Sequence, residues 1–166
     1  MFLITIDGPA GSGKTTLAEQ IHDCISKSGE SVATIHMDDL YSGWDHALSP
    51  ALTDSIKEIL NAYETGSDLL IPQYKWVARS FSDPLTITSP AVLIIEGVGS
   101  GERVTRKSAD IKLWIEAPAE IALARVLARD GENFRAQMQN WQLQESEHFL
   151  KEGTKSAADY QVKSAP

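Results

Sequence analysis

The sequence predicts a three-layer α/β fold in which one sheet of about five parallel strands is covered by helices on both faces. Three observations support this prediction. Short apolar runs alternate along the chain with patterns of helical spacing, no internal repeat or linker divides the 166 residues, and 42% hydrophobic residues suffice for one core of ordinary size. We therefore expect a single domain over residues 1–166.

The strands are expected where apolar residues run together. Residues 2–6, 31–36 and 111–115 each form such a run, and residues 91–95 form the most apolar one, which predicts a central strand. A further short strand is expected over residues 158–162.

Helices are expected where apolar residues recur three or four positions apart. The predicted helices begin near residues 14, 50, 118 and 132 and end near residues 29, 66, 130 and 151. Ser49 as N-cap and Pro50 at the first helical position announce the second helix. The apolar stripe of this helix comprises Leu52, Ile56, Ile59, Leu60 and Tyr63. The stripe of the last helix comprises Phe134, Met138, Trp141, Glu145 and Phe149.

The segment between the second helix and the central strand is unusual. Residues 69–90 contain Pro72, Pro84 and Pro90, and prolines interrupt regular structure. We expect an irregular connection, and connections of this length are usually functional or mobile.

Charge and cysteine content restrict the possible partners. The net charge of −8 and the sequence pI of about 4.9 disfavour a general nucleic-acid binder, which needs a basic face. They are compatible with a nucleotide site, because a few local cations and Mg²⁺ suffice to hold a polyphosphate. Cys24 is the single cysteine, and the N-terminal apolar run is too short for a signal peptide or membrane span. We expect a cytoplasmic protein without a nucleic-acid or membrane partner, and the sequence leaves a homo-oligomer open.

A phosphate-binding motif follows the first predicted strand. Residues 8–15, GPAGSGKT, match GxxxxGK[ST] without a gap, directly before a predicted helix. The glycines let backbone N–H groups turn toward phosphates, and the helix N-terminus adds the positive end of a dipole. A glycine-rich hairpin with a surface lysine would share this composition, but the flanking strand and helix favour a P-loop.

The P-loop predicts ATP and Mg²⁺ as cofactors. Lys14 is expected to bridge the β- and γ-phosphates and so to act in catalysis, and the Thr15 hydroxyl is expected to bind Mg²⁺. The residues expected to bind ATP in this loop are Gly8, Ala10, Gly11, Ser12, Gly13, Lys14, Thr15 and Thr16.

Acidic residues end two other predicted strands. Asp38 and Asp39 follow the second strand, and Glu96 follows the strand at residues 91–95. Because ligands of an open α/β sheet bind at the carboxyl ends of its strands, these acids should face the same crevice as the P-loop. Glu96 can then hold Mg²⁺, and Asp38 or Asp39 can accept the proton of an attacking hydroxyl. The alternative is that the aspartates only cap turns.

Five segments in this order, GPAGSGKTT, MDDLY, IPQYKW, VLIIEG and RVLARD, resemble the uridine kinase and nucleoside kinase-like group of P-loop proteins. The resemblance covers roughly residues 2–145. It implies an ATP-dependent phosphotransferase that moves the γ-phosphate to a small-molecule hydroxyl. The expected acceptor is the 5′-hydroxyl of a nucleoside similar to uridine or cytidine.

The resemblance also assigns residues to the acceptor site. Asp38 and Tyr41 lie in a segment similar to the family's D-x-F-Y element, which makes Asp38 the base and Tyr41 a neighbour of the substrate. Tyr74 lies in the element that helps to enclose the nucleoside, and Arg79 lies near a histidine position that contacts the base. Glu96 completes the expected substrate site.

A short lid near residues 125–135 is implied as well. Arg125 and Arg129 are the counterparts of lid arginines that reach the ATP phosphates, and Arg135 can join them. The first two are four positions apart and share one helical face. Such guanidinium groups stabilise the charge of a phosphoryl-transfer transition state. The alternative is a solvated basic face paired with neighbouring acids.

The sequence departs from the family pattern around the acceptor. Lys75 stands where the family has an acid, and Leu40 replaces an aromatic residue. A kinase for a sugar or an anionic coenzyme precursor is therefore a second interpretation, which Lys75 and Arg79 would suit. A nucleoside monophosphate kinase is disfavoured, because residues 39–66 contain no arginine for a second phosphate. A regulatory nucleotide-binding NTPase without an acceptor is the alternative from another class.

Aromatic residues near these elements have two interpretations. Trp44, Tyr74 and Trp76 lie in segments without a clear core stripe, so they can stack on a base or seal a loop against the core. Trp141 lies on a helical stripe and is expected to pack in the core. His36, His46 and His148 have no partners at metal-ligand spacing, and none of them is assigned a role.

Overall fold

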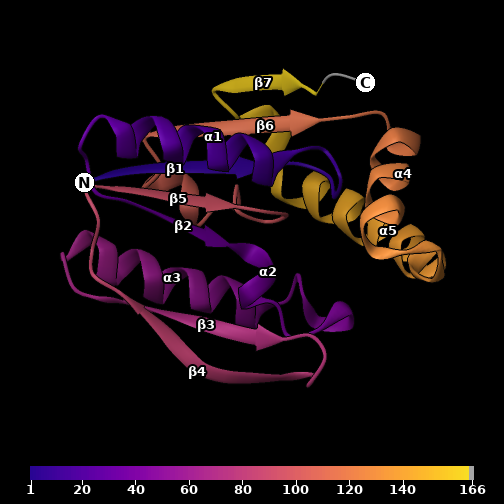
Figure 1. Cartoon of the computed structure of the whole chain (residues 1–166), viewed down its shortest axis with the longest axis horizontal. Coiled ribbons are helices and arrows are strands. Elements are labelled where there is room, and N and C mark those ends of the chain that lie inside the picture. Colours follow the sequence, from indigo (N-terminus) through magenta and orange to yellow (C-terminus); the bar gives the residue numbers. More distant parts are fainter. Residues whose placement is uncertain (165–166) are drawn as a thin grey trace.

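The computed structural model describes residues 1–164, and its main sheet contains five parallel strands in the order β2-β5-β1-β6-β7. Helices cover both faces of this sheet (Figure 1). The predicted fold class is confirmed, and residues 165 and 166 of the predicted domain lie outside the described part of the chain. The bounds of the strands are Phe2–Asp7 (β1), Val32–His36 (β2), Val92–Glu96 (β5), Ile111–Glu116 (β6) and Tyr160–Lys163 (β7).

The four predicted helices are present, and the structure adds the short helix α6 after the last of them and 3₁₀ turns at Trp44–His46 and Thr105–Lys107. Two further differences lie near the candidate site. The loop expected after β2 contains the short helix α2, and the helix expected from residue 132 begins only after a single 3₁₀ turn at Glu132–Phe134, because Gly131 interrupts the helical backbone. Among the described residues, no helix has both the length and the apolar composition needed to cross a membrane. The bounds are Lys14–Lys27 (α1), Met37–Leu40 (α2), Pro50–Glu64 (α3), Ala119–Asp130 (α4), Arg135–Glu152 (α5) and Thr154–Ala157 (α6).

Alternating side chains of the strands build a core on each face of the sheet. Leu93 and Ile95 of β5 pack on one face with residues of α3 and α5, whereas Ile94 packs on the other face with residues of α1. Since β5 lies between β1 and β2, both of its faces are buried, which explains its continuous apolar sequence. All five predicted stripe residues of α3 are buried.

Residues 69–87 form an antiparallel hairpin, which corrects the prediction of an irregular connection. This two-stranded sheet is separate from the main sheet and packs against α2 and α3 (Figure 1). Pro72 falls at a shift in the strand register, where the ladder is interrupted, and Pro84 lies on an exposed edge strand that needs no donor toward solvent. The two strands are Leu69–Lys75 (β3) and Ser80–Ile87 (β4).

Candidate active site

The P-loop joins β1 to α1 and packs tightly against two other elements. A Cβ atom at Gly8 would lie 2.0 Å from the Ile115 carbonyl oxygen, and one at Gly11 would lie 2.2 Å from that of Ala122. Both glycines have positive φ angles, 145° and 76°. Only glycine lacks a Cβ atom and adopts such φ angles without strain. The two glycines therefore allow the loop to pack closely against β6 and α4. Gly13 ends the loop as the residue before α1.

Lys14 lies within this loop, with 8% of its surface exposed. Its Nζ donates hydrogen bonds to the carbonyl oxygens of Gly8 (2.8 Å) and Pro9 (2.9 Å). The buried Ser12 hydroxyl has no hydrogen-bond partner among the described residues, and Thr16 is exposed in the first turn of α1. A cation, a hydroxyl and a helix N-terminus therefore meet at one place, which suits a polyphosphate.

Glu96 ends β5 and is buried beside the start of α1. Its Oε1 accepts a hydrogen bond from the Thr15 hydroxyl at 3.1 Å and lies 2.6 Å from His36 Nδ1. The hydrogen bond to Glu96 raises the pKa of His36 above its ordinary value. His36 is thus a residue of the site that the sequence pattern does not single out.

The Thr15 and Glu96 pair fits the predicted Mg²⁺ site. A hydroxyl and a carboxylate are oxygen ligands of the kind that Mg²⁺ prefers, and both belong to elements that meet at the P-loop. Within residues 1–164, no group of three or more His, Cys, Asp or Glu is arranged to hold a metal. The remaining ligands would then be phosphate oxygens and water, as is usual for Mg²⁺ in kinases.

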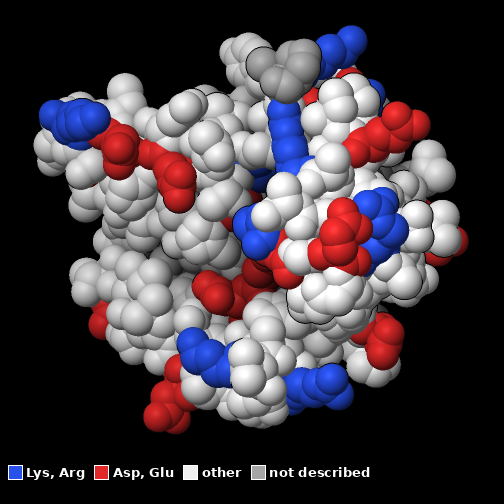
Figure 2. Space-filling view, turned by 45° about the vertical axis from the view of Figure 1, so that its right-hand side comes forward, with Lys and Arg blue, Asp and Glu red and all other residues white. Residues whose placement is uncertain are grey.

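Asp38 follows β2 on α2 and lies at the same end of the sheet. Its side chain reaches solvent, but protein atoms surround much of it, and this loss of hydration raises its pKa above the ordinary value. The charge of Lys14 opposes the rise, and that of Glu96 adds to it. Figure 2 shows acidic side chains gathered in a recess near the centre of the visible face, with basic side chains above and below it. A carboxylate in this setting can accept a proton from a hydroxyl.

The residues predicted around the acceptor lie in three different environments. Tyr74 is half-buried on β3, and its ring centroid lies 5.2 Å from that of Trp76. Arg79 is exposed at the hairpin turn with a positive φ of 54°. Tyr41 is only 2% exposed and donates a hydrogen bond of 2.7 Å to the Val98 carbonyl oxygen. Tyr41 therefore supports the loop after β2 from the core side.

Trp44 and Trp76 are partly buried and pack against the core. Their ring centroids lie 5.0 Å apart, and that of Trp44 lies 5.7 Å from that of Trp141. Trp76 Nε1 donates a hydrogen bond of 3.3 Å to the Asp38 carbonyl oxygen. We call Trp44, Tyr74 and Trp76 the aromatic wall; Trp76 joins it to the backbone of Asp38.

Arg125 and Arg129 of α4 make different contacts. Arg125 Nη1 lies 3.4 Å from the Gly11 carbonyl oxygen and 2.8 Å from Ser164 Oγ, so this side chain touches the P-loop. Arg129 donates two hydrogen bonds of 2.7 Å to the Asp130 carboxylate. The contact with Asp130 is the main cause of the raised pKa of Arg129. The charges of Asp38 and Glu96 raise this pKa as well, so Arg129 lies within reach of both acids.

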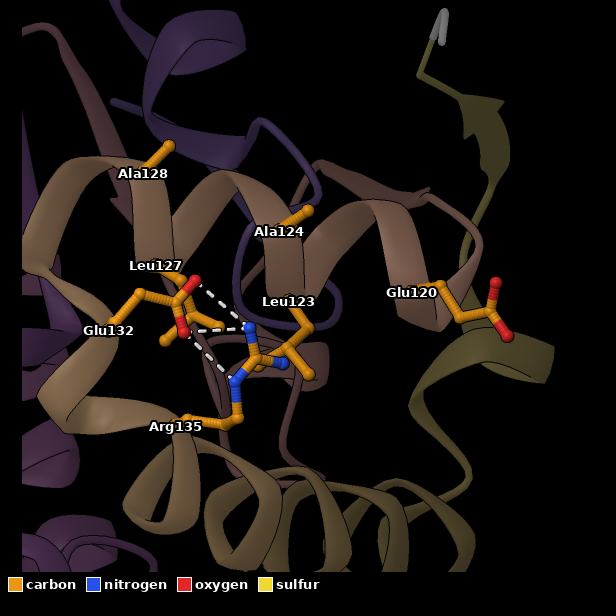
Figure 3. Close-up of a pocket in the computed structure, with 7 residues that line it drawn as sticks. All are labelled: Glu120, Leu123, Ala124, Leu127, Ala128, Glu132 and Arg135. Carbon is orange, nitrogen blue, oxygen red and sulfur yellow. Dashed lines mark hydrogen bonds and ion pairs between the residues drawn. The ribbon is translucent and has the colours of Figure 1, made fainter.

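Arg135 lies apart from the P-loop. Its guanidinium group binds Glu132 through hydrogen bonds of 2.7 to 3.0 Å, beside a hollow of about 410 Å³ between α4 and the start of α5 (Figure 3). In the structure, Arg135 therefore does not accompany the two arginines of α4. The hollow is lined by Glu120, Leu123, Ala124, Leu127, Ala128, Glu132 and Arg135.

Two buried acids contact the P-loop without having been predicted to do so. Asp7 Oδ1 accepts the Gly8 N–H at 2.7 Å, and burial raises the pKa of Asp7 to about 6. Glu145 Oε2 accepts the Ala10 N–H at 2.9 Å, and burial raises the pKa of Glu145 to about 7. The sequence does contain one signal for the contact of Glu145. This acid lies on an apolar helical stripe, and a buried carboxylate needs a polar partner.

Buried carboxyl groups predict that stability falls as the pH rises. Burial raises the pKa of Asp7 to about 6 and those of Glu102 and Glu145 to about 7, so the folded protein holds these protons more tightly than the unfolded chain. The free energy of unfolding should decrease as the pH rises from about 4, near the pKa of these groups in the unfolded chain, to about 7, by roughly 1.4 kcal/mol for each unit of pKa difference. Urea unfolding at both pH values measures this decrease.

The Glu102→Gln variant provides the internal comparison. Glutamine keeps an oxygen acceptor for the Thr53 hydroxyl, which lies 2.8 Å from Glu102 Oε2, but cannot ionise. This variant should lose less stability over the same pH range, whereas exposed Glu147→Gln should behave as the wild type. A wild type that is more stable at the higher pH would contradict the prediction.

Comparison with known proteins agrees with this geometry. A family model described as AAA domain matches residues 4–147. A curated uridine kinase from Staphylococcus aureus (strain JH9) is 28% identical over 146 residues, which cover 77% of this chain and 68% of that protein.

Solved structures share the fold. A possible uridine kinase from Bacillus stearothermophilus superposes with a TM-score of 0.69 at 19% identity and covers 97% of this chain and 88% of its own. A protein from Silicibacter sp. TM1040, provisionally described as a fructose transport system kinase, superposes with a TM-score of 0.70 at 16% identity, with coverage of 99% and 89%. At these identities the likeness concerns the fold.

Proposed function

Because the chain belongs to the AAA-domain family of P-loop proteins and is a kinase of the uridine kinase-like type, we propose that it transfers the γ-phosphate of ATP to the 5′-hydroxyl of a nucleoside such as uridine or cytidine. One observation carries this proposal: Lys14, the Thr15–Glu96 pair and Asp38 meet at one end of the sheet. Thr15 Oγ1 lies 3.1 Å from Glu96 Oε1, and the charges of Lys14 and Glu96 act on Asp38. Phosphate binding, metal binding and proton transfer require such groups.

In the proposed reaction, Asp38 accepts the proton of the acceptor hydroxyl while the hydroxyl oxygen attacks the γ-phosphorus. The bond from the γ-phosphorus to the β–γ bridging oxygen breaks, and ADP leaves with that electron pair. Lys14 holds the β- and γ-phosphates, and Arg129 adds a second cation from α4. Mg²⁺, which Thr15 and Glu96 would hold, supplies further positive charge when it is bound.

The aromatic wall favours a planar acceptor. Trp76 contacts the backbone of the candidate base directly, and Trp44 and Tyr74 contact Trp76. Aromatic rings attract other planar rings through offset or edge contacts, so a nucleobase suits this place better than a small aliphatic acid.

A second candidate is a kinase for an anionic acceptor. Lys75 and Arg79 are exposed at the end of the same hairpin that carries Trp76. Two cations at the edge of the acceptor region would attract a carboxylate or phosphate on the acceptor.

The test is ADP release from Mg-ATP with a panel of nucleosides, nucleoside monophosphates, sugars and pantothenate-like acids. We expect uridine or cytidine to raise turnover far above the rate with water. Stimulation by anionic acceptors alone, abolished by Lys75→Gln but not by Lys57→Gln on the exposed face of α3, would favour the second candidate. Turnover that is indifferent to every acceptor would contradict both and favour a nucleotide-binding NTPase.

A further inference from the structure

One face of α5 contacts three separate loops, two of which belong to the candidate site. Trp141 lies 5.6 Å from Tyr41 between ring centroids, so this end of the face touches the loop after β2. Glu145 binds the P-loop, and Glu152 Oε2 accepts the N–H of Arg103, in the loop after β5, at 3.0 Å. The positions 141, 145 and 152 share a face at helical spacing. A movement of α5 would therefore be felt by all three loops.

The contact of Glu145 with the P-loop is chemically unusual for a phosphate site. Its Oε2 accepts the Ala10 N–H at 2.9 Å, and its side chain is 2% exposed. In a P-loop, backbone N–H groups are donors for phosphate oxygens. A carboxylate oxygen is an anionic acceptor of the same kind, so Glu145 uses a donor that a phosphate can use.

We propose that Glu145 is a positioning residue that competes with a nucleotide phosphate for the Ala10 N–H, so that nucleotide binding releases α5 from the P-loop and shifts Trp141 against the acceptor loop. The inference rests on the proposed function in requiring that a nucleotide binds at the P-loop. Its physical basis is that two anionic oxygens close to one donor repel each other. Only a short turn at residues 132–134 separates α5 from α4. A movement of α5 therefore also changes the position of Arg129 near the end of α4.

Protonation of Glu145 would relieve this competition. The charged or titratable groups that face Glu145 are Lys14 from the P-loop, Asp7 from β1 and Tyr41 after α2. Burial has the largest effect and raises the pKa of Glu145 to about 7. The charge of Asp7 adds to this rise, whereas that of Lys14 opposes it. A neutral Glu145 repels a phosphate less than an ionised one does. Nucleotide binding should therefore weaken as Glu145 ionises.

The experiment compares the dissociation constant of a non-hydrolysable Mg-ATP analogue at about pH 6 and about pH 8 by calorimetry. In the wild type we expect binding to be about tenfold weaker at the higher pH, since one pKa unit corresponds to a tenfold effect. Glu145→Gln, which keeps an oxygen acceptor for Ala10 but cannot ionise, should remove most of that difference and bind more tightly than the wild type at the higher pH. Asp7 and the nucleotide titrate in the same range in both proteins, so the difference between them isolates Glu145.

Exposed Glu147→Gln on the same helix is the matched control and should follow the wild type. Urea midpoints establish that each variant is folded. The intrinsic fluorescence of the wild type should change when the analogue binds, and Trp141→Phe should remove a large part of that change. If Glu145 had only a structural role, no fluorescence change from Trp141 would be expected on binding.

The outcomes separate this inference from the proposed function. A Glu145→Gln protein with the affinity and pH dependence of the wild type, or with weaker binding at both pH values, would overturn the inference alone. A wild type that does not bind the analogue at either pH would overturn the nucleotide site itself, and the inference with it.

Discussion

Replacing Asp38 with asparagine is expected to lower kcat with the best acceptor by about 10² to 10⁴-fold. The amide cannot accept the proton of the acceptor hydroxyl, whereas the size and the position on α2 are retained. The Michaelis constant for ATP should change little, because Asp38 is assigned to the acceptor and not to the nucleotide. Steady-state ADP release at varied acceptor and varied ATP measures the two effects separately.

Asp39→Asn is the adjacent comparison, since the sequence alone leaves both aspartates open as the base. We expect it to retain most of the activity. Asp54→Asn, which removes an exposed partner of Lys57 on α3, should leave turnover unchanged. A large loss in Asp39→Asn together with an active Asp38→Asn would show that the base has been assigned to the wrong residue.

Replacing Lys14 with methionine is expected to weaken ATP binding and to lower kcat by about 10² to 10³-fold, the range found when one preorganised charge or donor is removed from a transition state. Methionine keeps an aliphatic stem in the buried position but loses the cation that contacts the Gly8 and Pro9 carbonyl oxygens. Calorimetry with the ATP analogue gives the loss of binding, and ADP release at saturating ATP gives the loss of turnover.

Lys27→Met, at the other end of α1, is the control for the loss of one positive charge. It should preserve both the affinity and the turnover. Because Lys14 also holds the loop through two hydrogen bonds, the urea midpoint of the variant must be measured. Normal turnover in folded Lys14→Met would remove the P-loop from the mechanism.

The buried elements of the fold were predictable because their signals are local. The stripe from Leu52 to Tyr63 follows from helical spacing alone, and the apolar run of β5 reflects a strand buried on both faces. The hairpin was not predictable in the same way. Pro72 and Pro84 indicate irregular structure when they are read locally, but a register shift and a solvent-facing edge accommodate them in strands.

In the candidate site, too, the residues with local signals could be predicted and the contacts between distant positions could not. The P-loop residues, Glu96 and Asp38 could be predicted because each follows a recognisable strand. The partners of Glu145 and His36 could not, since Ala10 lies 135 positions from Glu145 and Glu96 lies 60 positions from His36. Contacts over such separations arise from the topology of the sheet and the packing of α5 on one of its faces, which a single sequence does not reveal.

The separate hairpin of β3 and β4 has an evolutionary consequence. It carries Tyr74, Trp76, Lys75 and Arg79, which we propose to lie near the acceptor, while the P-loop and the proposed metal-binding pair belong to the main sheet and α1. Substitutions, insertions or even replacement of this one supersecondary unit can therefore redirect the protein to another acceptor while the nucleotide-binding half is inherited unchanged. Grafting hairpins between homologous domains is accordingly a rational route to kinases with new acceptors.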